Sequence, residues 1–134
     1  MTRSGAEKWL FALAALAFFL AGCQGGQSQA GAASAVEKYL QARAASDVDQ
    51  MTLLSCPAWE AQARIEAASF KSMNAKLDGV SCQVSGSDGD STLVICQGKI
   101  VTTYQGEARQ WSVGDHPFKV TQQDGEWRMC GYGQ

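Results

Sequence analysis

The sequence predicts an α+β fold in which N-terminal helices pack on a curved, four-stranded antiparallel sheet. Three observations lead to this prediction. Apolar residues recur at helical spacing up to Leu77, whereas from Val80 onward they alternate with polar residues. Tight-turn pairs such as Asp124-Gly125 divide the second half into short strands. Helices followed by a run of hairpins are typical of a sheet with helices covering one face.

Three helices are expected in the first half of the domain. The first covers residues 32–45, where Val36, Tyr39 and Leu40 lie on one face. A short second helix follows the capping sequence at residues 46–49 and ends near Cys56. The third begins at a proline, which suits a first helical turn. Its apolar stripe is Trp59, Ala63, Phe70, Met73 and Leu77.

Glu66 falls within the stripe of this third helix. A carboxylate on an apolar face needs a partner or water, because its desolvation costs several kcal/mol. We interpret Glu66 as a residue at the edge of the stripe that reaches solvent or pairs with an Arg or Lys. The alternative interpretation is an acid inside a pocket.

The strands are predicted to form a meander with a definite register. A turn centred on Gly89 places Cys82 opposite Cys96 and Val84 opposite Val94. A second turn, at residues 105–106, sets residues 100, 102 and 104 opposite residues 111, 109 and 107. The segment 114–117 interrupts the third strand and changes its alternation, which predicts a bulge or bend.

The first 22 residues have the organisation of a secretory signal peptide. A basic start precedes a 12-residue apolar run, which is shorter than the roughly 20 residues that cross a membrane. The sequence Leu20-Ala21-Gly22-Cys23 resembles the lipobox of bacterial lipoproteins. This resemblance implies cleavage between Gly22 and Cys23 and attachment of acyl chains such as palmitate at Cys23. The alternative is an ordinary secretory signal that leaves a free or paired thiol.

The resemblance implies an exported protein that is anchored to the cell envelope by lipid. Gln24, where an aspartate would direct retention, resembles the outer-membrane pattern of organisms with two membranes. Residues 23–34 then form the lipidated cysteine and a flexible Gly-, Ser- and Gln-rich tether, and residues 35–133 form one domain.

Export places the other four cysteines in an oxidising compartment, where an even set normally pairs. Four cysteines allow three pairings. The hairpin register favours Cys82 with Cys96, and elimination leaves Cys56 with Cys130. With one histidine and no C-x-x-C spacing, we expect neither a metal site nor a cofactor.

The order of elements and the closing strand at residues 124–130 resemble the nuclear transport factor 2-like, cystatin-like superfamily of small cone-shaped domains. Enzymes of that superfamily, the steroid isomerases and polyketide cyclases, use an acidic base and polar donors inside the cone. Fold resemblance alone does not carry activity.

Two function classes remain. The first is a non-catalytic binding or interaction domain, monomeric or weakly dimeric, for an envelope protein, a glycan or a small apolar ligand. The second is a small isomerase, cyclase or hydrolase.

Pocket candidates are Glu66, Tyr104 and His116, although His116 is most simply a loop residue and Tyr104 a packing residue at a hairpin end. A formal net charge of −2 without any Lys/Arg cluster argues against nucleic acid as a partner. A cavity lined by Glu66 and a hydrogen-bond donor favours a ligand pocket or an enzyme, whereas a filled interior favours an interaction module.

Overall fold

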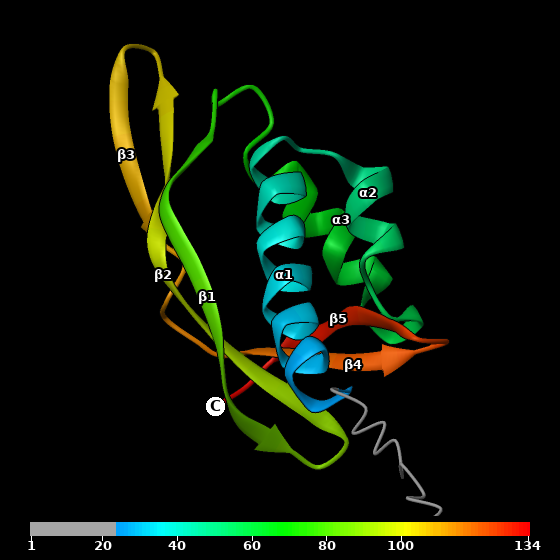
Figure 1. The fold of residues 1–134 in the computed structure, drawn as a ribbon. Helices are drawn as coiled ribbons and strands as arrows, with labels where there is room; N and C mark the ends of the chain where they lie inside the picture. Colours follow the sequence, from blue (N-terminus) through cyan, green and yellow to red (C-terminus); the bar gives the residue numbers. More distant parts are fainter. Residues whose placement is uncertain (1–23) are drawn as a thin grey trace, which may run out of the picture.

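Helices come first and strands second in the chain, as Figure 1 shows. The computed structural model describes residues 24–134, and the predicted signal peptide, cleavage site and Cys23 lie outside them. The helices are α1 (Gln24–Ala44), α2 (Val48–Leu53), the 3₁₀ turn η1 (Pro57–Trp59) and α3 (Glu60–Ala68). The strands are β1 (Lys76–Asp88), β2 (Ser91–Tyr104), β3 (Glu107–Ser112), β4 (Phe118–Gln123) and β5 (Glu126–Tyr132). The α+β class is therefore confirmed.

The long strand β2 organises the antiparallel sheet. Strand β1 pairs along one edge of β2, and β3 and β4 pair with opposite ends of its other edge. Strand β5 pairs with β4. The predicted interruption at residues 114–117 is present, but it divides the expected third strand into two, so the sheet has five strands instead of four.

The predicted pairs are present in both hairpins: Cys82 faces Cys96 and Val84 faces Val94 across β1 and β2, and Ile100 faces Trp111 across β2 and β3. Beside the first turn the alignment differs by one residue from the predicted one, because Asp88 pairs with Ser91. A bulge or irregularity between Val84 and Gly86 restores the predicted pairs further along the strands.

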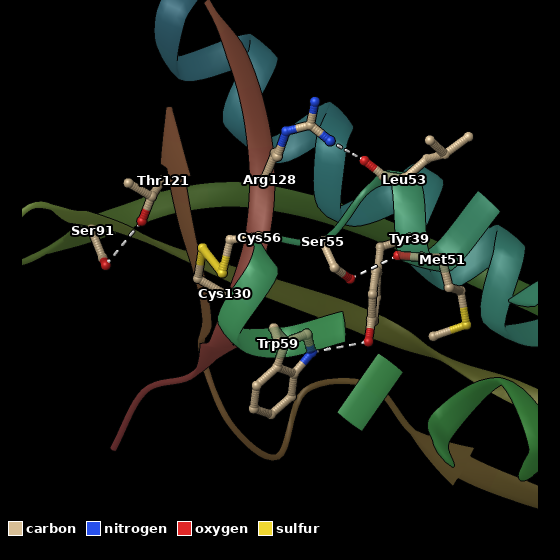
Figure 2. Close-up of a disulfide and its surroundings, with 10 residues drawn as sticks. All are labelled: Tyr39, Met51, Leu53, Ser55, Cys56, Trp59, Ser91, Thr121, Arg128 and Cys130. Carbon is tan, nitrogen blue, oxygen red and sulfur yellow. Dashed lines mark hydrogen bonds between the residues drawn. A yellow bond between two sulfur atoms is a disulfide. The ribbon is translucent and has the colours of Figure 1, made fainter. Parts of the chain in front are cut away.

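Both predicted disulfides are present. The Cα atoms of Cys82 and Cys96 are 4.1 Å apart, and those of Cys56 and Cys130 are 5.3 Å apart. The second bond forms because the segment that precedes η1 runs beside β5, as Figure 2 shows. There the Cys56 N–H donates to the carbonyl of Met129, and the Met129 N–H donates to the carbonyl of Leu54.

The third helix is shorter than predicted. Helix α3 ends at Ala68, and Leu77 belongs to β1. Ser72 and Asn74 adopt left-handed backbone conformations, with φ of 63° and 47°, which a right-handed helix cannot contain. The apolar period continues past the helix because Phe70 still packs into the core.

The first helix begins earlier than predicted. Helix α1 includes the stretch that we expected to be a tether, and Ala32 is fully buried. A Cβ atom added to Gly31 would lie 2.8 Å from the indole of Trp127. The small residues that predicted flexibility thus let α1 approach β5 closely.

The core lies between α1 and the sheet. Figure 1 shows α1 between the β1–β2 side of the sheet and the pair α2–α3. Helix α1 contributes Val36, Tyr39 and Leu40, and β2 contributes Val94 and Ile100. None of the helices in the described range 24–134 is long and apolar enough to span a membrane.

Candidate functional site

Glu66 is buried in the interior of the domain. Its side chain lies on α3 and the residue is only 5% exposed, so the interpretation that it reaches solvent is wrong. No Lys or Arg lies within ion-pair distance of it among the described residues. The carboxylate must therefore be stabilised by hydrogen bonds.

Two tyrosine hydroxyls supply those hydrogen bonds. The Tyr39 hydroxyl, on α1, donates to Glu66 Oε2 at 2.8 Å. The Tyr132 hydroxyl, on β5, lies 2.9 Å from Oε1 and 3.0 Å from Oε2 of Glu66. Trp59 Nε1 in turn donates to the Tyr39 hydroxyl at 3.1 Å, a contact drawn in Figure 2. The network connects α1, η1, α3 and β5 through Glu66.

Burial and the carboxylate act together on both tyrosines. Desolvation raises the pKa of Tyr39 far above its ordinary value, and the negative charge of Glu66 raises it further. The pKa of Tyr132 is raised by the same two causes in the same order. Both hydroxyls, which already hold their protons at neutral pH, consequently remain protonated donors to Glu66 at alkaline pH as well.

A cavity of about 320 Å³ lies next to this network. It opens between the helices and the sheet, near the part of β2 where the pairing partner changes from β3 to β4. Its apolar lining includes Phe70, Ile100, Val113 and Phe118, and Trp111 lies at the rim, 44% exposed. Its polar lining comprises Arg43, Glu66, Ser112, Asp115, His116 and the hydroxyl-bearing Tyr132.

The cavity brings together two of the three pocket candidates from the sequence. Glu66 and His116 both line it, Glu66 as a buried residue and His116 on the exposed segment between β3 and β4. Tyr104 does not line it, because it stands at the end of β2 and is 55% exposed. As the sequence indicated, Tyr104 lies at the end of a hairpin, and this position keeps it away from the cavity.

Tyr39, Arg43 and Tyr132 are among the site residues that were not predicted. Tyr39 was assigned only to the apolar face of α1, and neither Arg43 nor Tyr132 was a candidate. The ring of Tyr132 is held by Trp59 and Phe118, with ring centroids 5.5 and 5.3 Å away. A tyrosine on each of two core-facing elements, in a chain that also buries a carboxylate, is the signal that could have identified the network.

The Arg43 guanidinium has an unusual environment. Its Cζ lies 5.4 Å from the centroid of the Phe70 ring, within the range of a cation–π contact. Its Nε is buried without a hydrogen-bond partner. In the part of the chain that the structure describes, no carboxylate lies within 4 Å of the guanidinium nitrogens.

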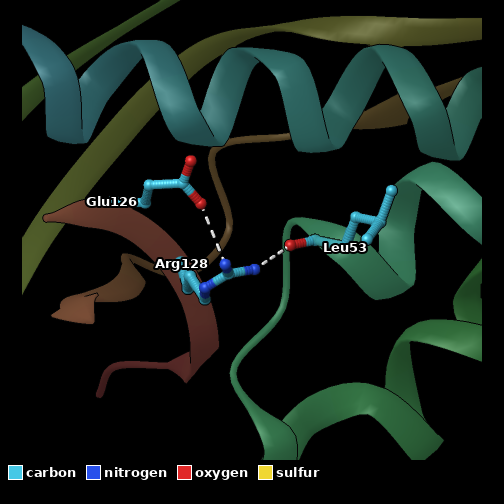
Figure 3. Close-up of polar contacts among 3 residues, drawn as sticks. All are labelled: Leu53, Glu126 and Arg128. Atoms are coloured by element: carbon cyan, nitrogen blue, oxygen red, sulfur yellow. Dashed lines mark hydrogen bonds and ion pairs between the residues drawn. The ribbon is translucent and has the colours of Figure 1, made fainter. Parts of the chain in front are cut away.

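A larger cavity, of about 520 Å³, lies between α1, α2 and β5. Two of its three charged side chains already have partners, Lys38 being the third: Figure 3 shows Arg128 donating to the carbonyl of Leu53 and to Glu126, the latter at 2.9 Å. These contacts join β5 to α2, so Arg128 acts as a structural link. Within residues 24–134, no three His, Cys, Asp or Glu side chains are grouped in a way that could hold a metal ion.

Comparison of the chain with known protein families, curated proteins and solved structures found no match. The function is therefore inferred from the residues that line the cavity beside Glu66.

Proposed function

We propose that this protein is a lipid-anchored cell-envelope protein whose domain binds a small, largely apolar molecule in the cavity beside Glu66. The observation that carries the proposal is the open cavity lined by a buried carboxylate and by the donor Tyr132. A filled interior would have favoured a protein-interaction module instead.

The composition of the cavity supports small-molecule binding. Ligand pockets are mostly apolar and contain a few fixed polar groups that orient the ligand. Here Phe70, Ile100 and Phe118 supply apolar walls, while Tyr39 and Tyr132 hold Glu66 in one position. The helices on one face of a bent sheet also support the finer proposal of a nuclear transport factor 2-like cone.

The anchor proposal rests on Leu20-Ala21-Gly22-Cys23 and is supported by the two disulfides, which are typical of exported proteins. Gly31 already packs on Trp127, so only the seven residues 24–30, which belong to α1, separate Cys23 from the packed domain. Even with these residues fully extended, Cys23 and Gly31 would be at most about 28 Å apart. The domain would therefore lie close to the membrane, the outer one if the organism has two.

Mass spectrometry of the mature N-terminus tests the anchor. We expect a diacylglyceryl and an acyl group on Cys23, and the variant Cys23→Ser should carry neither. An unmodified Cys23, or cleavage at another bond, would contradict the proposal.

An enzyme of the isomerase, cyclase or hydrolase type is the second candidate, because Glu66 and His116 line one cavity and both residue types perform acid–base chemistry. We favour binding because both carboxylate oxygens of Glu66 already accept tyrosine hydrogen bonds. A base engaged in this way is less available to a substrate proton.

The binding proposal is tested with phenylnaphthylamine, a neutral aromatic probe whose fluorescence rises in apolar sites. We expect saturable binding of one probe per chain. Trp111→Ala should weaken it about tenfold, because the variant removes an aromatic wall at the rim. Tyr104→Ala is the matched control, since it removes an exposed aromatic from the same hairpin outside the cavity and should leave the affinity unchanged. Equal loss in both variants, or no saturable binding by the wild-type protein, would refute the pocket.

A further inference from the structure

Arg43 is the one permanently cationic side chain that lines the cavity among the residues described. The ion pairs of the described part of the chain involve other cations: Lys99, Arg109, Lys119 and Arg128. A guanidinium has five N–H donors, and that of Arg43 makes no hydrogen bond within the described chain. Its contact with the Phe70 ring fixes the position of the guanidinium, but none of the N–H donors, which lie in the plane of the guanidinium, gains a hydrogen bond from this contact.

The buried carboxylate that lines the same cavity already has hydrogen-bond partners. Glu66 lines the same cavity, but its two oxygens accept hydrogen bonds from Tyr39 and Tyr132. The other lining carboxylate, Asp115, is on the exposed segment between β3 and β4, where water screens its charge. The cavity thus presents a cation without a fixed counter-ion beside apolar walls.

We propose that the ligand is an amphipathic organic anion: a compact apolar body that carries one carboxylate or similar acidic group, which pairs with Arg43. This inference rests on the proposed binding function and adds the ligand's charge to it. A planar guanidinium matches an acidic group with two parallel hydrogen bonds, and the pair is stronger in a site that is partly withdrawn from water. The apolar body would contact Phe70, Ile100 and Trp111.

The other charges of the cavity restrict the ligand further. Glu66 and Asp115 repel additional negative charge, so a molecule with a single acidic group fits better than a polyanion. His116, on the same exposed segment as Asp115, can donate a hydrogen bond to a polar substituent at the rim.

The test compares two probes that differ by one acidic group. Anilinonaphthalene sulfonate is phenylnaphthylamine with a sulfonate added, so the ratio of their dissociation constants measures what the acidic group contributes. We expect the anionic probe to bind at least about tenfold more tightly, the effect of one charge-assisted hydrogen-bond pair.

The variant Arg43→Met should remove this advantage and change the affinity for the neutral probe by less than about threefold, since the methionine still covers Phe70. Arg64→Met is the matched control: it removes the same charge from an exposed position on α3 outside the cavity and should preserve the preference. Circular dichroism and thermal unfolding verify that each variant is folded.

A measurement on the wild-type protein does not depend on any variant folding. Naphthylacetate should displace phenylnaphthylamine at about a tenfold lower concentration than naphthylacetamide, which has the same shape without the charge. Equal affinity of the two probes, or equal potency of the two competitors, would refute the anion proposal and leave the pocket intact. Loss of both probes alike in Arg43→Met would also refute it, because Arg43 would then be structural. Failure of the neutral probe to bind the wild-type protein would refute the proposed function itself.

Discussion

Replacing Cys56 and Cys130 together by serine is expected to lower the free energy of unfolding by about 4 kcal/mol. The disulfide closes a loop with a sequence separation of 74 residues and joins the segment before η1 to β5. In the chain-entropy model, removing a link over a longer loop releases more conformational freedom in the unfolded chain. The elements that this bond holds together also carry Trp59 and Tyr132, so we expect the Glu66 network to loosen in the variant.

The matched comparison is the pair Cys82 and Cys96, whose separation is 14 residues and whose replacement should cost about 3 kcal/mol. Urea unfolding at neutral pH, followed by tryptophan fluorescence, measures both. Changing two cysteines at once avoids a free thiol that could form wrong disulfides. A smaller loss for Cys56 and Cys130 than for Cys82 and Cys96 would contradict the loop-length explanation.

The substitution Tyr39→Phe is expected to destabilise the protein by about 3 kcal/mol, because it removes two hydrogen bonds and one of them is to a charged group. Tyr39 is fully buried, so water cannot replace its hydroxyl. Glu66 would lose one of its two donors, and the indole N–H of Trp59 would lose its acceptor. Phenylalanine fills nearly the same volume, so the measured loss reports on the hydrogen bonds and not on a cavity.

Tyr104→Phe provides the control for this variant. Tyr104 is 55% exposed, its hydroxyl makes no hydrogen bond within residues 24–134, and the change should alter stability by less than about 0.5 kcal/mol. Denaturant unfolding of both variants gives the difference. If the two substitutions cost the same, the network around Glu66 contributes nothing to folding, and its role in holding the pocket would need another explanation.

The sheet was more predictable from the sequence than the helices. The two-residue turn at 105–106 fixes which residues face each other in the second hairpin, so the pairing of Ile100 with Trp111 followed from counting. The end of α3 could not be found in this way, because Phe70 faces the core from a turn and continues the helical period. At α1 the small residues suggested flexibility, but Gly31 serves close packing on Trp127.

The candidate site was only half predictable for a similar reason. Glu66 attracted attention because a carboxylate contradicts an apolar stripe, and His116 because it is the one histidine of the chain. Their partners gave no such signal. Tyr39 and Tyr132 lie 27 and 66 residues from Glu66 in the sequence, and only the tertiary fold brings the three side chains together.

The segment at residues 113–117 has a consequence for how this domain could change during evolution. It leaves the sheet between β3 and β4, and hydrogen bonds hold it near both ends: the Val113 N–H donates to the carbonyl of Gly98, the Gly114 N–H donates to Ser112 Oγ, and the carbonyl of Pro117 accepts from the Gly133 N–H. Asp115 and His116, between those ends, are exposed and line the cavity. If the cavity binds a ligand as proposed, mutations at these two positions would diversify ligand preference among descendants of this chain at little cost in stability, because the framework that holds Glu66 does not depend on them.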